Sequence, residues 1–210
     1  MLRRALAFGA LLVGLGLAAP ARAQQLPIGL LPFDVVNVSG AAGDAGANLA
    51  KLVRLEMIRG RTLRPILLEL PADAALPLDP SNAAQIGAGA GAALVVAGTV
   101  VDATQQHSSN RANTGALLSG FGVGGSVSKQ TARVSLDIEV IDAATGQLVK
   151  TFEVEGKNTD VGVGMDFSSA LGGLGVGDDA WEKSPMGKAL REAARKVSEA
   201  LTRVAKNRPK

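Results

Sequence analysis

Residues 133–140, RVSLDIEV, decide the fold of this chain because apolar and polar side chains alternate along them without a break. In an extended chain the apolar members all fall on one side, and these are Val134, Leu136, Ile138 and Val140. This period of two predicts a strand with one buried face. The stretch 143–146, AATG, then predicts a tight turn, since Gly146 can adopt positive φ.

A returning strand is expected directly after this turn. Apolar residues resume there and are expected on the same buried face: Leu148, Phe152 and Val154. The two strands and the turn between them form a β-hairpin at the centre of the fold.

The segments on either side predict further strands and helices. Residues 92–103 are rich in valine and predict a central strand, residues 26–36 a buried strand, and residues 62–70 an edge strand that contains Pro65. Helices are predicted at 45–59, 79–90 and 184–206, with Asp44, Asp79 and Ser184 as N-caps and Gly60 ending the first. This order predicts an α/β fold with a mixed sheet and flanking helices.

Two long inserts rich in glycine and serine interrupt this frame, at about 104–131 and 158–183. Within each insert, apolar residues alternate with small or polar ones, as in FGVGGSVS and VGVGMDFS. Such alternation is typical of strands in an oligomeric membrane barrel, but it also fits flexible loops or soluble hairpin arms. If the inserts are membrane hairpins, the residues expected to face lipid are Leu117, Phe121, Val123, Val127, Val161, Val163, Met165 and Phe167.

The first 23 residues predict a secretory signal peptide. Arg3 and Arg4 precede an apolar run, and Ala21-Arg22-Ala23 is a small-x-small cleavage pattern. We therefore expect export, with one domain over residues 24–210. The chain carries 22 basic and 19 acidic residues, and removal of three arginines with the signal peptide leaves a net charge of zero. This balance argues against nucleic acid as a partner.

No group of residues suggests catalysis. The stretch 120–125 matches G-x-G-x-x-G, but a strand rather than a helix is expected to follow, so it lacks the helix N-terminus that binds a pyrophosphate. His107 is the only histidine and is expected in a polar loop, and there is no cysteine. We therefore predict a protein that is not an enzyme and that uses no metal or cofactor.

Several stretches together resemble the curli production assembly/transport component (CsgG) family. They are IGLLPFDV, AQIG, GAALVVAGTV, RVSLDIEVID, TGQLV and a closing helix after Ser184-Pro185, in this order. The resemblance implies a periplasmic α/β domain, a ring of subunits, and inserts that become membrane hairpins. It also implies a pore loop over residues 36–43, formed here by Asn37, Val38, Ser39 and Gly40. Channel members are lipoproteins with aromatic pore loops, and this chain has neither a cysteine nor an aromatic residue there.

Two functions follow as hypotheses. The first is a homo-oligomeric component of cell-envelope assembly or secretion, similar to the curli secretion channel. It would be exported to the periplasm, associate with the outer membrane, and handle secreted or envelope protein subunits. The alternative is a soluble periplasmic accessory or binding protein of the same fold.

Overall fold

The computed structural model describes residues 25–36, 38, 44–71, 74–109, 128–160, 170–171, 181 and 183–208. The elements follow one another as β1 (Leu26–Leu30), β2 (Asp34–Val35), α1 (Ala45–Gly60), β3 (Leu63–Leu67), α2 (Pro80–Gly89), β4 (Leu94–Ser109), β5 (Ser128–Asp142), β6 (Leu148–Asp160) and α5 (Pro185–Lys206).

The strands form a single mixed sheet in the order β3-β1-β4-β5-β6, and the short strand β2 pairs with β4. The pairs β1–β3, β1–β4 and β2–β4 are parallel, whereas β4–β5 and β5–β6 are antiparallel. The predicted central position of β4 and edge position of β3 are both confirmed. The mixed α/β sheet with flanking helices is thus the observed fold.

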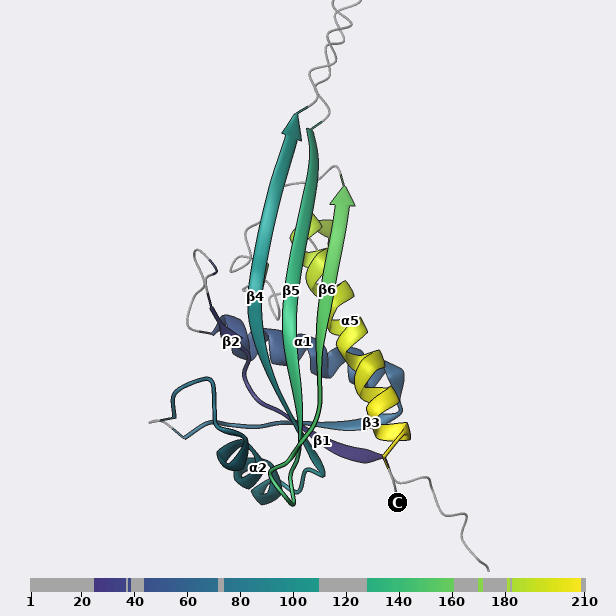
Figure 1. Cartoon of the computed structure of the whole chain (residues 1–210). Helices are drawn as coiled ribbons and strands as arrows, with labels where there is room; N and C mark the ends of the chain where they lie inside the picture. Colours follow the sequence, from purple (N-terminus) through teal and green to yellow (C-terminus); the bar gives the residue numbers. More distant parts are fainter. Residues whose placement is uncertain are drawn as a thin grey trace, which may run out of the picture.

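Helices cover the two faces of the sheet unequally. Helices α1 and α5 pack on one face and form the main core with the apolar side chains of β4, β5 and β6. Helix α2 covers a smaller area of the opposite face, where it packs on Val95, Ile141 and Ala143. Figure 1 looks onto that second face, with α1 behind the strands and α2 below them. The upper part of this second face carries no helix in the described part of the chain.

The alternation in residues 133–140 works as predicted. Val134, Leu136, Ile138 and Val140 are all fully buried in the main core, and Gly146 adopts φ 70° in the turn. Leu148, in contrast, is exposed rather than buried. A bulge shifts the register between Val140 and Ile141, so that Leu148 pairs with Ile141, whose side chain points to the α2 face. Leu148 therefore lies on the opposite side from Phe152 and Val154.

The strand expected over residues 26–36 is broken into β1 and β2. Between them, the backbone N–H of Leu31 donates to Val96 O at 3.0 Å, and that of Phe33 donates to Gly46 O at 3.2 Å. The chain thus leaves β1 to contact the start of α1 and then rejoins β4. The Phe33 ring packs over Gly98 of β4, where a Cβ atom would lie only 2.4 Å from its Cε1 atom.

The helix ends agree only in part with expectation. Asp79 caps α2 by accepting from the Ser81 N–H at 3.2 Å, and Ser184 caps α5 by accepting from the Gly187 N–H at 2.9 Å. Asp44 precedes α1 but makes no capping hydrogen bond. At the other end of α1, the left-handed position belongs to Arg61, with φ 54°, because Gly60 continues the helix by one residue.

The strands continue into both inserts. Strand β4 extends to Ser109, so that His107 lies in a strand and not in a loop, and β5 begins at Ser128. Strand β6 extends to Asp160 in the second insert. Beyond it, Ala170, Leu171 and Trp181 are helical and buried in the main core. The second insert is therefore not a simple β-hairpin, because the side chains of these three residues pack into the main core.

Candidate functional site

The residues predicted to face lipid all lie outside the described residues, as do Asn37, Ser39 and Gly40 of the predicted pore loop. Val38 is described, and its side chain is half-buried against the main core. The lipid-facing and pore-loop assignments therefore stay predictions. Among the described residues, two hollows and one exposed helix face are the candidate functional surfaces.

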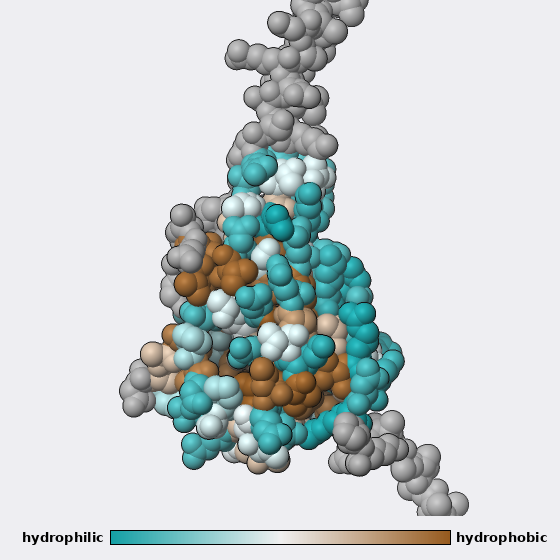
Figure 2. Space-filling model, viewed as in Figure 1, coloured by the Kyte–Doolittle hydropathy of each residue, from teal (hydrophilic) through white to brown (hydrophobic). Residues whose placement is uncertain are grey.

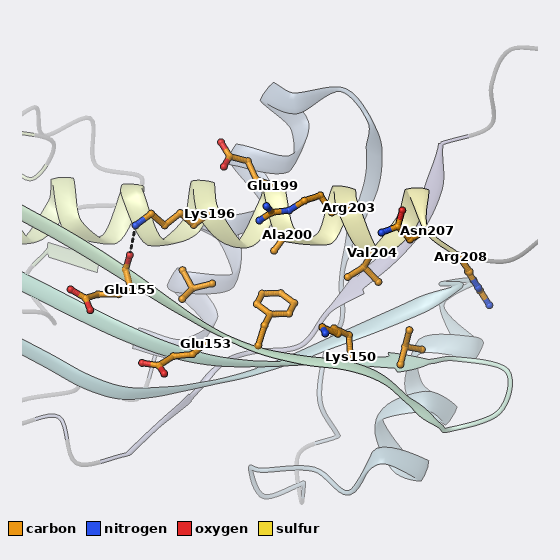
Figure 3. Close-up of a pocket in the computed structure, with 13 residues that line it drawn as sticks. Lys150, Glu153, Glu155, Lys196, Glu199, Ala200, Arg203, Val204, Asn207 and Arg208 are labelled. Atoms are coloured by element: carbon orange, nitrogen blue, oxygen red, sulfur yellow. Dashed lines mark hydrogen bonds between the residues drawn. The ribbon is translucent and has the colours of Figure 1, made fainter.

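The first hollow is a groove of about 820 Å³ between the edge strand β6 and helix α5. Figure 3 shows α5 running along the strand, with Ala200 and Val204 of the helix directed toward the strand and Glu199 directed away from it. Its apolar wall is formed by Val149, Phe152, Val154, Ala200 and Val204. Charged side chains of both signs line the rest: Lys150, Glu153, Glu155, Lys196, Glu199, Arg203 and Arg208.

Lys196 partly closes the free edge of β6 inside this groove. Its Nζ donates to the backbone carbonyl of Glu155 at 2.8 Å (Figure 3). An unpaired carbonyl on an edge strand can accept a hydrogen bond from a strand of another chain. A lysine that donates to this carbonyl makes such pairing less favourable. At this point the edge is thus protected against the addition of another strand.

Asp142 ties the C-terminal end of α5 to the β5–β6 turn beside this groove. One carboxylate oxygen accepts from the N–H groups of Ala144 at 2.9 Å and Thr145 at 3.1 Å. The other oxygen accepts from the guanidinium of Arg208. Burial by itself would raise the pKa of Asp142, but these hydrogen bonds and the charge of Arg208 outweigh it, and the pKa is lowered.

Replacing Asp142 by asparagine is expected to lower the free energy of unfolding at pH 7 by about 2 kcal/mol, since it removes a charged acceptor of several hydrogen bonds. A lowered pKa in the folded state means that this stabilisation is present at neutral pH and is lost as pH falls through the folded pKa, below the ordinary value of about 3.9. Urea denaturation at pH 7 and pH 3 should therefore show the two proteins converging in acid. Asp44→Asn is the control, because Asp44 makes no capping hydrogen bond. A difference between Asp142→Asn and the parent chain that stayed constant down to pH 2 would contradict this role.

The second hollow, of about 490 Å³, lies on the sheet face that α2 leaves uncovered. Its floor is largely apolar and contains Leu31, Leu76, Leu78 and Ala97. Four carboxylates stand around this floor, namely Asp34, Asp137, Glu139 and Glu153, and its lining contains no lysine or arginine. Figure 2, which looks onto this face, shows a mostly hydrophilic surface interrupted by hydrophobic patches.

The sheet register brings like charges together at this hollow. Asp137 of β5 lies directly opposite Glu153 of β6, and Glu139 is the next residue but one on the same face. Like charges placed opposite each other in a sheet destabilise it. None of these side chains has a basic partner among the described residues, and no group of acidic, histidine or cysteine residues there is arranged to hold a metal ion. The hollow is therefore an acidic surface without an internal counter-charge in the described part of the chain.

The third surface is the outer side of α1. Leu55 and Ile58 are 44% and 47% exposed, and their spacing of three residues places them next to each other on the helix surface. At helical spacing they share one stripe with three exposed basic residues, Lys51, Arg54 and Arg59. We call this stripe the α1 outer face. Sequence reasoning missed it, although the spacing of its residues is visible in the sequence.

The chain belongs to the CsgG family. The sequence model of this family, described as curli production assembly/transport component CsgG, matches residues 60–209. This match confirms the resemblance that the sequence motifs indicated. The chain is thus an envelope-associated protein of the CsgG fold. No curated protein matches it significantly.

Several solved structures have a similar fold. The hypothetical protein CT253 from Chlamydia trachomatis superposes with a TM-score of 0.54 at 11% sequence identity, covering 88% of this chain and 100% of that one. A PelC dodecamer from Paraburkholderia phytofirmans gives 0.49 at 16% identity, covering 87% and 91%. A lipoprotein from Caulobacter crescentus CB15 gives 0.40 at 15% identity, covering 86% and 93%. At such identities the likeness extends to the fold alone.

Within the described residues, none of the helices combines the length and the apolar character that crossing a membrane would require.

Proposed function

We propose that this protein is a non-enzymatic component of cell-envelope assembly or secretion that works as a ring of identical subunits at the outer membrane. In this proposal the α/β domain lies in the periplasm, and the two inserts of neighbouring subunits together form the membrane part. Secreted or envelope protein subunits are the cargo. Membership of the CsgG family is the general support for this role.

One observation carries the proposal: both inserts leave the sheet at the same end. Strands β4 and β5 stay paired from Leu94 and Asp142 to Ser109 and Ser128, which lie inside the first insert. Strand β6 stays paired with β5 up to the pair Gln130–Asp160, and Asp160 lies inside the second insert. Figure 1 shows the three strands rising together above the helices.

This arrangement is what a shared membrane barrel requires. Each insert has apolar residues at alternate positions, and the first insert is long enough for two strands of about 10 residues. Strand edges inside a membrane must be paired, so the inserts of one subunit need neighbours on both sides. Inserts that start at the same end of the sheet could pair with those of adjacent subunits in a closed ring.

The test is whether the native protein stays in the outer membrane after a carbonate wash and runs as a large, heat-sensitive oligomer on a semi-native gel. Phe121→Asp and Val163→Asp are expected to abolish this oligomer in the membrane, because a charge on a lipid-facing strand position is costly. Leu148→Asp is the matched control, since Leu148 is 51% exposed on the sheet domain. Normal assembly of both insert variants would refute the lipid-facing assignment.

A soluble accessory protein that binds an envelope partner is the second candidate. The groove between β6 and α5 favours it, because it combines an apolar wall with charges of both signs on one side of the molecule. Such a groove suits an extended segment of another protein. If the native protein washes into the soluble periplasmic fraction as a small species, this second function replaces the first.

A further inference from the structure

We infer that the α1 outer face of one copy docks on the acidic hollow of the next copy, and that this contact joins the subunits head to tail. The inference rests on the ring in the proposed function and names the surfaces that build it. Its partner is a second copy of this chain, chosen because the same molecule carries two complementary surfaces.

The two surfaces have matching chemistry. The α1 outer face presents Leu55 and Ile58 between basic side chains, and the hollow presents an apolar floor between carboxylates. Apolar centres surrounded by charges of opposite sign are the usual anatomy of a specific protein interface. The charges that would meet are Lys51, Arg54 and Arg59 on the helix and Asp34, Asp137, Glu139 and Glu153 around the hollow.

These charges are largely unpaired within one molecule. Lys51 Nζ bonds only the neutral Asn48 side chain, at 3.1 Å, and Arg54 has no carboxylate partner among the described residues. Arg59 pairs with Glu56 on its own helix. Docking would give the opposed Asp137 and Glu153 the counter-charges that their own sheet does not supply.

The positions of the two surfaces prevent them from meeting within one copy. Helix α1 packs on the sheet face that buries Leu136 and Ile138, whereas Asp137 and Glu139 project from the opposite face. Each copy therefore offers one surface of each kind, on opposite sides of its sheet. A contact between two different surfaces can repeat from one copy to the next. The copies form a closed ring when the rotation between neighbouring subunits divides a full turn evenly.

The experiment is charge reversal with rescue on the full chain, in which oligomer size is measured by native mass spectrometry and analytical ultracentrifugation of the membrane extract. We expect two double variants each to weaken assembly at least tenfold: Lys51→Glu/Arg54→Glu on the helix and Glu139→Lys/Glu153→Lys at the hollow. Salt at 0.5 M should also weaken the parent oligomer, because it screens the charges that meet. Mixing the two variants should restore the oligomer, since each then meets a surface of opposite charge. Arg203→Glu, in the other groove, is the control and should assemble normally.

Several outcomes would overturn the inference. It is wrong if both double variants assemble like the parent chain, or if their mixture fails to assemble although circular dichroism shows both folded. It is also wrong if the α1 variant assembles normally but loses binding to anionic phosphatidylglycerol vesicles, because α1 would then be a lipid-binding surface. In these cases a parent chain that still forms a membrane oligomer leaves the proposed function standing. A parent chain that is monomeric in the soluble fraction would refute the ring itself.

Discussion

Phe33→Ala is expected to lower the free energy of unfolding by about 4 kcal/mol, a large part of the stability of an ordinary domain. Phe33 is 2% exposed, and its ring fills the space above Gly98 of β4. It also lies where the chain passes from β1 to the start of α1 and back to β2. Alanine would leave a cavity at the junction of these elements, because the small residue at 98 cannot fill it.

Urea denaturation followed by tryptophan fluorescence can measure this loss. Trp181 is the only tryptophan, is buried in the main core, and stacks 5.3 Å from the guanidinium of Arg191, so its emission reports on packing. Leu148→Ala is the control and should change stability by less than about 0.5 kcal/mol, since Leu148 is 51% exposed. A loss at Phe33 no greater than at Leu148 would mean that the ring does not hold this junction together.

The second large effect is expected at Gly156, where α5 packs directly against the backbone of β6. A Cβ atom at this position would lie 2.0 Å from the carbonyl oxygen of Ala189 and 2.8 Å from the backbone nitrogen of Ala193. Both contacts are with backbone atoms, so no side-chain rotation can relieve them. Gly156→Ala should therefore push the helix from the sheet and cost about 3 kcal/mol.

Gly89→Ala provides the matched control for the same substitution. No atom lies within 4 Å of a Cβ built at Gly89, which is the last residue of helix α2. There alanine should leave stability unchanged or raise it by up to about 1 kcal/mol, because it restricts the unfolded chain and favours the helix. Paired urea midpoints and near-ultraviolet circular dichroism would reveal the contrast. Equal stability of the two variants would mean that α5 does not approach β6 so closely.

The regular elements could be predicted because each follows from a local pattern. The alternation from Val134 to Val140 defines β5, the valine-rich run defines β4, and the apolar stripe from Ala189 to Leu201 defines the buried side of α5. Backbone period and side-chain burial are linked within a single element, so a sequence reader can place the element and its buried face. The caps at Asp79 and Ser184 followed from equally local chemistry.

The interruptions of these elements could not be predicted in the same way. The break at Phe33 depends on hydrogen bonds to Gly46 and Val96, which are remote in sequence. The exposure of Leu148 depends on a bulge that changes its partner on β5. A shift in register by one residue moves a side chain to the other face of the sheet, and this shift cannot be recognised from the local sequence pattern.

The sequence by itself determined the secondary structure, the mixed α/β architecture, the resemblance to the CsgG family and the alternating pattern of the two inserts. Only the tertiary structure decided which surfaces exist. Strand pairing placed Asp137 opposite Glu153 and brought both inserts to the same end of the sheet. Helix packing left Leu55 and Ile58 exposed beside basic side chains. The reason is physical: periodicity is a property of one segment, whereas a surface is formed by segments that only the folded chain brings together.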